Sequence, residues 1–219
     1  MAQTRTLSPG SDLARCGLRV HRLLNPTRGM SKIFYISHPE VVIDPAVPVP
    51  KWLLSEVGRA RAALLCHREW MSEVEAIYSS SERKARDLAE IISATLSIAP
   101  RYLDGLSEID RTSTGFLEAK DHEATANAFF AHPQVSISGW ERATDAQARI
   151  AAAIGSVIDE TREARAVAVC GHGGVGTLYL CKLKGVAISP DEQQRGMGNY
   201  YAFETPSLRL IHGWRPIDD

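Results

Sequence analysis

Ala166-Val-Ala-Val-Cys-Gly-His-Gly-Gly-Val-Gly176 is the stretch of sequence that decides the fold. It opens with a short apolar run, which is typical of a strand buried on both faces, and a histidine set among glycines follows. A second apolar run, Ile33-Phe-Tyr-Ile-Ser-His38, also delivers a histidine at its end. We therefore expect both histidines at the carboxyl ends of strands, where ligands bind in open α/β sheets.

Candidate strands and helices alternate around these two runs. The strand patterns lie at residues 32–37, 74–79, 166–171, 200–204 and 208–213. Two longer stretches, 82–97 and 142–164, repeat apolar residues at helical spacing, and Ser55 is placed to cap a helix that runs to about Trp70. The alternation predicts an α/β fold, a three-layer sandwich whose mostly parallel central sheet is flanked by helices.

Composition sets the limits on function. The chain has 219 residues and a formal net charge of −1, so no overall field favours nucleic acid or an anionic membrane as the partner. Its four cysteines have no metal-ligand spacing, and no apolar stretch approaches the roughly 20 residues that span a bilayer. These features predict a cytoplasmic protein without a metal, a cofactor, a nucleic-acid partner or a membrane partner.

The first 30 residues differ from the rest. They contain five arginines and a single acid, Asp12, with no sustained periodicity. We interpret residues 1–30 as a basic, flexible leader and residues 31–219 as one domain. An Arg-rich, acid-poor leader is also compatible with a transit peptide, or with a start that truly lies at Met30.

Three further blocks share a known order with His38. They are Ile77-Tyr-Ser-Ser-Ser-Glu-Arg-Lys-Ala-Arg-Asp-Leu-Ala-Glu90, Leu106-Ser-Glu108 and Gly171-His-Gly-Gly-Val175. Together the blocks resemble the histidine phosphatase superfamily, also called phosphoglycerate mutase-like, over about residues 31–215. The chain looks like a divergent member, because Ser37-His38-Pro39 stands where the family has Arg-His-Gly.

The resemblance implies a phosphohydrolase that acts on a small phosphomonoester through a phosphohistidine intermediate. By this resemblance His38 is the nucleophile, Glu108 protonates the leaving oxygen, and His172 stabilises the charge on the phosphoryl group. The resemblance implies that the phosphate group is bound by Ser37, Lys84 and Gly173. The bound partner is expected to be the small phosphorylated substrate or free inorganic phosphate.

The departures from the family pattern weaken the expected phosphate site. Ser37 replaces a bidentate arginine, and a lost charge-assisted hydrogen bond costs about 1.5–3 kcal/mol. Pro39 stands where the family has a glycine and removes a backbone N–H donor. Lys84 stands where the family has a second arginine, and it keeps the positive charge but not the bidentate guanidinium group. Arg111 is a candidate to restore charge to the pocket.

Other interpretations stay open. The weakened site is compatible with an inactive pseudophosphatase that binds an anion or a partner protein. Phosphoglycerate mutase activity is disfavoured because a mutase must hold two phosphates. Gly171 to Gly176 also fits the GxGxxG pattern of dinucleotide-binding proteins, but only 28 residues follow Asp191, too few for the rest of such a domain. Residues 112–140 are expected to form a lid. The sequence identifies neither the substrate nor the oligomeric state.

Overall fold

A computed structural model describes residues 1–2 and 30–219 of the chain. The leader expected over residues 1–30 therefore falls almost wholly outside the described residues. Within the described part, no helix is long and apolar enough to cross a membrane.

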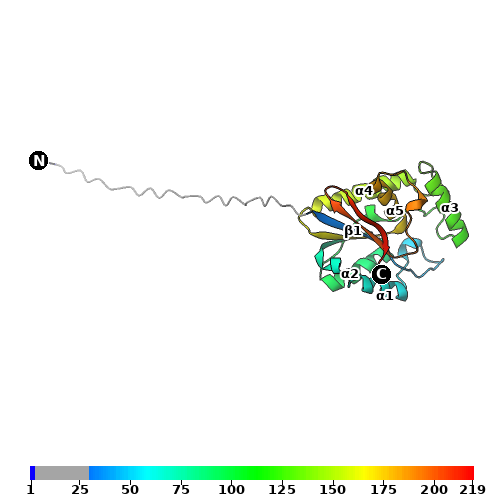
Figure 1. Cartoon of the computed structure of the whole chain (residues 1–219), viewed down its shortest axis with the longest axis horizontal. Coiled ribbons are helices and arrows are strands. Elements are labelled where there is room, and N and C mark those ends of the chain that lie inside the picture. Colours follow the sequence, from blue (N-terminus) through cyan, green and yellow to red (C-terminus); the bar gives the residue numbers. More distant parts are fainter. Residues whose placement is uncertain (3–29) are drawn as a thin grey trace.

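A mixed six-stranded sheet forms the centre of the molecule (Figure 1). Its strands are β1 (Ser31–Ser37), β2 (Val74–Ser79), β3 (Arg101–Tyr102), β4 (Ala166–Gly171), β5 (Asn199–Thr205) and β6 (Leu210–Pro216). They lie in the order β3-β2-β4-β1-β5-β6. The first four in this order are parallel, whereas β5 runs antiparallel to β1 and β6 antiparallel to β5.

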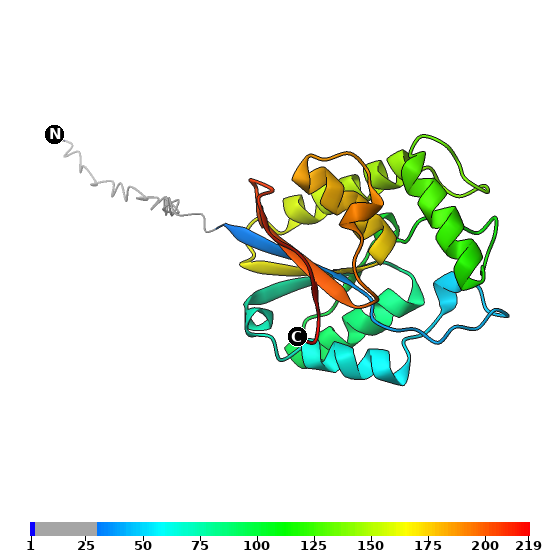
Figure 2. The same ribbon diagram turned by 45° about the vertical axis from the view of Figure 1, so that its right-hand side comes forward.

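Helices cover both faces of this sheet (Figure 2). The helices are α1 (Glu56–Leu65), α2 (Arg83–Leu96), α3 (Ala119–Ala131), α4 (Ala143–Glu160) and α5 (Gly173–Lys184). Within residues 30–219, four short 3-10 turns lie at Val49–Lys51, Glu69–Glu73, Asp104–Leu106 and Pro190–Glu192. Figure 1 shows α1 and α2 on one side of the sheet and α4 and α5 on the other, with α3 at the right-hand edge of the molecule.

The sheet has a hydrophobic core on each face, and successive side chains of β1 point alternately into one core and the other. Ile33 and Tyr35 join the core beneath α4 and α5, whereas Phe34 and Ile36 join the core beneath α1 and α2. A strand that buries both faces in this way needs a continuous apolar run, which is the pattern that the sequence shows. The predicted three-layer sandwich with a mostly parallel sheet is confirmed.

Most predicted boundaries agree with the structure to within a few residues. Ser55 caps α1, because its Oγ accepts a hydrogen bond of 2.9 Å from the Gly58 N–H. The helix then ends at Leu65 rather than near Trp70, and the chain turns into the 3-10 segment Glu69–Glu73. The expected lid, 112–140, contains α3, which the sequence did not reveal because this helix buries only Phe129 and Phe130 and has little apolar periodicity.

Candidate active site

The two histidines lie side by side at one edge of the sheet. β1 and β4 are neighbouring parallel strands in which Ser37 is paired with Gly171, so the next residue of each strand, His38 and His172, emerges at the same level. The ring centroids are 5.3 Å apart and the ring planes are inclined by 71°. The sequence predicted that His38 and His172 meet at one edge of the sheet, and the structure places them there.

The ring of His38 is held in one tautomer. Its Nδ1 lies 2.9 Å from the carbonyl oxygen of Pro39. Because a carbonyl only accepts, Nδ1 carries the proton and Nε2 keeps its lone pair. Burial lowers the pKa of His38 to about 4, and the positive charge of Lys84 contributes to the decrease. The ring is therefore neutral at physiological pH, and Nε2 has a free lone pair.

His172 is fixed through its backbone and its ring. The Tyr35 hydroxyl accepts a hydrogen bond of 3.1 Å from the His172 N–H and donates one of 3.0 Å to the His172 carbonyl. Gly171 leaves room for this hydroxyl, which would lie 2.4 Å from a Cβ at that position. The buried ring places Nε2 2.8 Å from Ser80 Oγ, and Nδ1 has no hydrogen-bond partner among the described residues. Burial lowers the pKa of His172 well below its usual value, so this ring is also neutral.

Glu108 lies at the amino end of α5. Its carboxylate accepts hydrogen bonds from the N–H groups of Gly174 at 3.0 Å, Val175 at 2.9 Å and Ile109 at 3.0 Å. Burial raises the pKa of Glu108, but the hydrogen bonds from the Ile109 and Val175 N–H groups are among the interactions that lower it, and the pKa is lowered overall, so the carboxylate is ionised. The expected phosphate-binding residue, Gly173, precedes this cluster, and its N–H is not among the donors to Glu108.

Arg149 of α4 positions the segment that carries Glu108. Its guanidinium donates to the backbone carbonyls of Gly105, Ser107 and Glu108 at 3.1, 2.8 and 3.2 Å, and it forms a salt bridge of 2.7 Å with Glu141. Sequence reasoning missed this role. Three of the acceptors are main-chain oxygens of a distant segment, which sequence spacing does not reveal.

Lys84 lies near the histidines but is not a free cation. Its buried ammonium group contacts the Glu82 carboxylate and donates a hydrogen bond of 3.1 Å to the Val49 carbonyl. Glu82 also accepts a hydrogen bond of 2.8 Å from the Glu108 N–H and lies 3.8 Å from His172 Nε2. The sequence analysis missed Glu82, because an acid just before a helix is ordinarily interpreted as a favourable helix-end charge.

Gln194 fills the space next to Ser37. The Ser37 hydroxyl contacts the Gln194 Oε1 and accepts a hydrogen bond of 3.0 Å from the Asn199 N–H. The Gln194 carboxamide also covers Gly173, where an added Cβ would meet its Nε2 at 2.3 Å. A neutral amide from the segment before β5 therefore lies beside Ser37.

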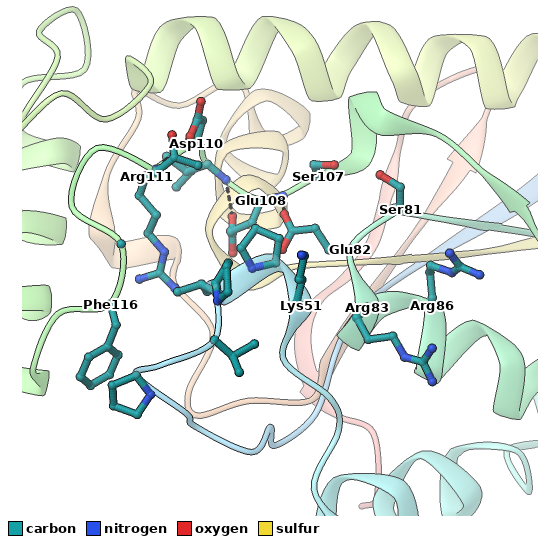
Figure 3. A pocket seen from close by; sticks show the side chains of 18 of the residues that line it. Lys51, Ser81, Glu82, Arg83, Arg86, Ser107, Glu108, Asp110, Arg111 and Phe116 are labelled. Carbon is teal, nitrogen blue, oxygen red and sulfur yellow. Dashed lines mark hydrogen bonds between the residues drawn. The ribbon is translucent and has the colours of Figure 1, made fainter.

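Two cavities meet at Glu108. The smaller, of about 290 Å³, is lined by His38, Gln194 and residues of α3. The larger, of about 800 Å³, lies between residues 45–51 and 107–116 (Figure 3). Among the charged side chains that act on His38, Lys84 is positive, whereas Glu82 and Glu108 are negative. Arg111, the candidate to restore charge to the pocket, also lines the smaller cavity. No cluster of three or more potential metal ligands occurs in the part of the chain that the structure describes.

Comparison of the sequence with known protein families shows to which family the chain belongs. The pattern described as Histidine phosphatase superfamily (branch 1) matches residues 49–199, which is more than half of the chain. The chain belongs to the histidine phosphatase superfamily. The matched region includes Lys84, Glu108 and His172, and it begins after Ser37 and His38. No curated protein sequence matches the chain.

Solved structures share the fold of this histidine phosphatase family member. A mycobacterial glucosyl-3-phosphoglycerate phosphatase in complex with inorganic phosphate is 18% identical, with a TM-score of 0.73 over 86% of this chain and 99% of the other. Bacillus stearothermophilus YhfR is 23% identical, with a TM-score of 0.67 over 84% and 95% of the two chains. A phosphoserine phosphatase from Entamoeba histolytica in complex with 3-phosphoglyceric acid is 16% identical, with a TM-score of 0.67 over 85% and 98%. The predicted family and fold are confirmed.

Proposed function

We propose that the protein is a phosphohydrolase that cleaves a small phosphomonoester through a phosphohistidine on His38. The observation that carries this proposal is the Nδ1–H of His38 bound to the Pro39 carbonyl, which leaves a neutral Nε2 lone pair beside the buried ring of His172. Attack on phosphorus through Nε2 needs this tautomer and this protonation state.

The reaction has two steps. In the first, the His38 Nε2 lone pair forms a bond to phosphorus while the bond between phosphorus and the ester oxygen breaks, and Glu108 gives a proton to the departing oxygen. In the second, water attacks phosphorus, the phosphorus–nitrogen bond breaks, and Glu108 takes a proton from the water. The negative phosphoryl group raises the pKa of Glu108 by like-charge repulsion, which opposes the decrease caused by its N–H donors and readies it to hold a proton.

Neutral donors would hold the phosphoryl group in place of the family arginine. If Ser80 donates its hydroxyl proton to His172 Nε2, the unpartnered Nδ1 of His172 carries a hydrogen that a phosphoryl oxygen can accept. The Gln194 carboxamide and the Gly173 N–H are the other donors at this position. In this arrangement, Ser37 contributes to phosphoryl binding by orienting the Gln194 side chain.

A second candidate function is a pseudophosphatase that binds an anion without turnover. It is favoured by the two carboxylates, Glu82 and Glu108, and by the ion pair of Lys84 with Glu82, so that Arg111 is the cation of the smaller cavity that has no carboxylate partner among the described residues. Release of inorganic phosphate from phenyl phosphate by the full chain separates the two candidates. Steady turnover supports the phosphohydrolase. Binding of inorganic phosphate, seen by calorimetry, without turnover of phenyl phosphate supports the pseudophosphatase.

We predict that Ser37→Arg alone gives little gain in kcat/KM, because the new guanidinium and the Gln194 side chain compete for one space. The double variant Ser37→Arg/Gln194→Ala frees that space, and a charge-assisted hydrogen bond of about 1.5–3 kcal/mol then raises kcat/KM by roughly 10- to 150-fold over the single variant. Gln194→Ala alone is the control and is expected to lower kcat/KM. Equal gains in the single and the double variant would show that Gln194 does not occupy the position of the arginine.

His38 is predicted to stay neutral far below the usual histidine pKa. With the pKa lowered to about 4 by burial and by Lys84, its ring keeps the Nδ1–H tautomer at pH 5 to 6. The unfolded chain binds this proton below about pH 6.5, so His38 lowers the stability of the fold as the pH falls from about 6.5 to about 4. A titration of the ring ¹⁵N shifts measures this pKa directly. A midpoint near the ordinary value would show that the ring is not enclosed as described.

A further inference from the structure

The larger cavity is wide enough for the organic part of a substrate. Its volume of about 800 Å³ lies in the range of about 300–1,000 Å³ that is typical of ligand sites. Glu108, the expected acid for the leaving oxygen, lines both this cavity and the smaller one that His38 lines. A leaving group protonated by Glu108 can therefore extend into the larger cavity (Figure 3).

The walls of the larger cavity are mostly rigid and apolar. One wall is the proline-rich segment with Pro45, Pro48 and Pro50, and the opposite wall has Ile109 and Phe116. The ring of Phe116 packs 5.9 Å from that of Trp52. Prolines offer no backbone N–H, so this wall suits a hydrocarbon or aromatic surface better than a polyhydroxylated one.

Four cations also line the cavity, and they are not equivalent. Arg83 forms a salt bridge of 2.7 Å with Asp87, and Arg86 lies 3.7 Å from Glu90 and over the ring of Tyr102. These two are committed to partners on or beside α2.

Arg111 and Lys51 have no carboxylate partner among residues 30–219, the part of the chain with described contacts. The Arg111 guanidinium lies 5.9 Å from the centre of the Trp140 ring, and Lys51 is exposed at the end of the proline-rich segment. Figure 3 shows Arg111 extending from the loop that follows Glu108, and Lys51 rising from the opposite wall.

The acids of the cavity already have donors. Glu82 contacts Lys84, Glu108 is held by N–H groups at the start of α5, and Asp110 accepts a hydrogen bond of 2.9 Å from the Thr112 N–H. Glu108 and Asp110 are held by neutral N–H groups, and Arg111 and Lys51 are the two cations of this cavity that have no carboxylate partner among the described residues. Arg111 also lines the smaller cavity beside His38.

We infer that the larger cavity binds the leaving group of the substrate, and that this group is apolar or aromatic and carries a second negative charge that Arg111 and Lys51 recognise. This inference rests on the proposed function, since it names the class of substrate for the same site. A carboxylate and a second phosphate share the required chemistry, because both accept charge-assisted hydrogen bonds from guanidinium and ammonium groups.

Three matched esters test the inference through turnover. They are phenyl phosphate, 4-(carboxymethyl)phenyl phosphate and 4-(aminomethyl)phenyl phosphate, in which a methylene group separates the second charge from the ring. We expect the carboxymethyl ester to exceed phenyl phosphate in kcat/KM by about tenfold, as one charge-assisted hydrogen bond allows, and the aminomethyl ester to be the poorest. Arg111→Gln and Lys51→Gln are each expected to reduce this preference severalfold. Arg86→Gln is the matched control, because it lines the same cavity but is paired, and it should leave the preference unchanged.

Binding of the corresponding phosphonates gives a readout that does not depend on catalysis. Tighter binding of the carboxymethyl phosphonate, reduced by Arg111→Gln, supports the inference even if no ester is hydrolysed, in which case it is the proposed phosphohydrolase that fails. Equal binding of the carboxymethyl and unsubstituted phosphonates overturns the inference whether or not phenyl phosphate is hydrolysed. An equal loss for all three ligands in Arg111→Gln also overturns it, because Arg111 would then serve the phosphoryl group itself.

Discussion

His38→Ala is expected to reduce the release of phosphate from phenyl phosphate by at least about 10⁴-fold, because removal of a nucleophile abolishes the covalent route. The neutral Nε2 of His38 beside His172 is the group from which the proposed reaction starts. Initial rates of phosphate release at matched enzyme concentrations measure the effect.

The control for this variant is another histidine of the same chain. His67 is exposed after the end of α1, away from both cavities, and His67→Ala is expected to keep the activity of the unmodified protein. Thermal unfolding of both variants checks that neither has lost its fold. Residual activity above about one per cent in a folded His38→Ala protein would require a different nucleophile.

Lys84→Met is expected to lower the free energy of unfolding by about 3–5 kcal/mol, the cost of leaving one partner of a buried ion pair alone. The Lys84 side chain is 4% exposed and that of Glu82 is 11% exposed, so water cannot readily replace the lost ammonium group. Glu82 also binds the N–H of Glu108, so its displacement disturbs the site as well as the core. Urea unfolding at neutral pH measures the difference.

The matched control is Lys84→Met/Glu82→Gln, which removes both charges together. It is expected to recover a large part of the lost stability, because no uncompensated charge remains in the interior. A single variant that costs less than about 1 kcal/mol, or a double variant as unstable as the sum of its two single variants, would show that Lys84 and Glu82 are not coupled.

The layers of the fold and the position of His38 and His172 could be predicted because they depend on local pattern. Apolar runs such as Ile33 to Ile36 identify buried strands, and the carboxyl ends of parallel strands meet at one edge of the sheet. The helix α3 could not be predicted, since it contributes only two large buried side chains and its remaining residues give no amphipathic period.

The polar partners of the site could not be predicted because they come from distant parts of the chain. Gln194 meets Ser37 across a sequence separation of 157 residues, and Arg149 reaches the Glu108 carbonyl across 41. No spacing rule joins such residues. The sequence indicated that the arginine clamp was missing, but only the geometry showed what lies beside Ser37.

The central claim is that a phosphoryl group is carried by His38, and trapping it tests this most directly. The full chain is mixed with ³²P-labelled phenyl phosphate and quenched within one turnover in alkali, where phosphohistidine survives, and the labelled peptide is then sequenced by mass spectrometry. The account predicts acid-labile label on His38 and none in His38→Ala. Label on any other residue, or no label while phosphate is being released, would contradict it.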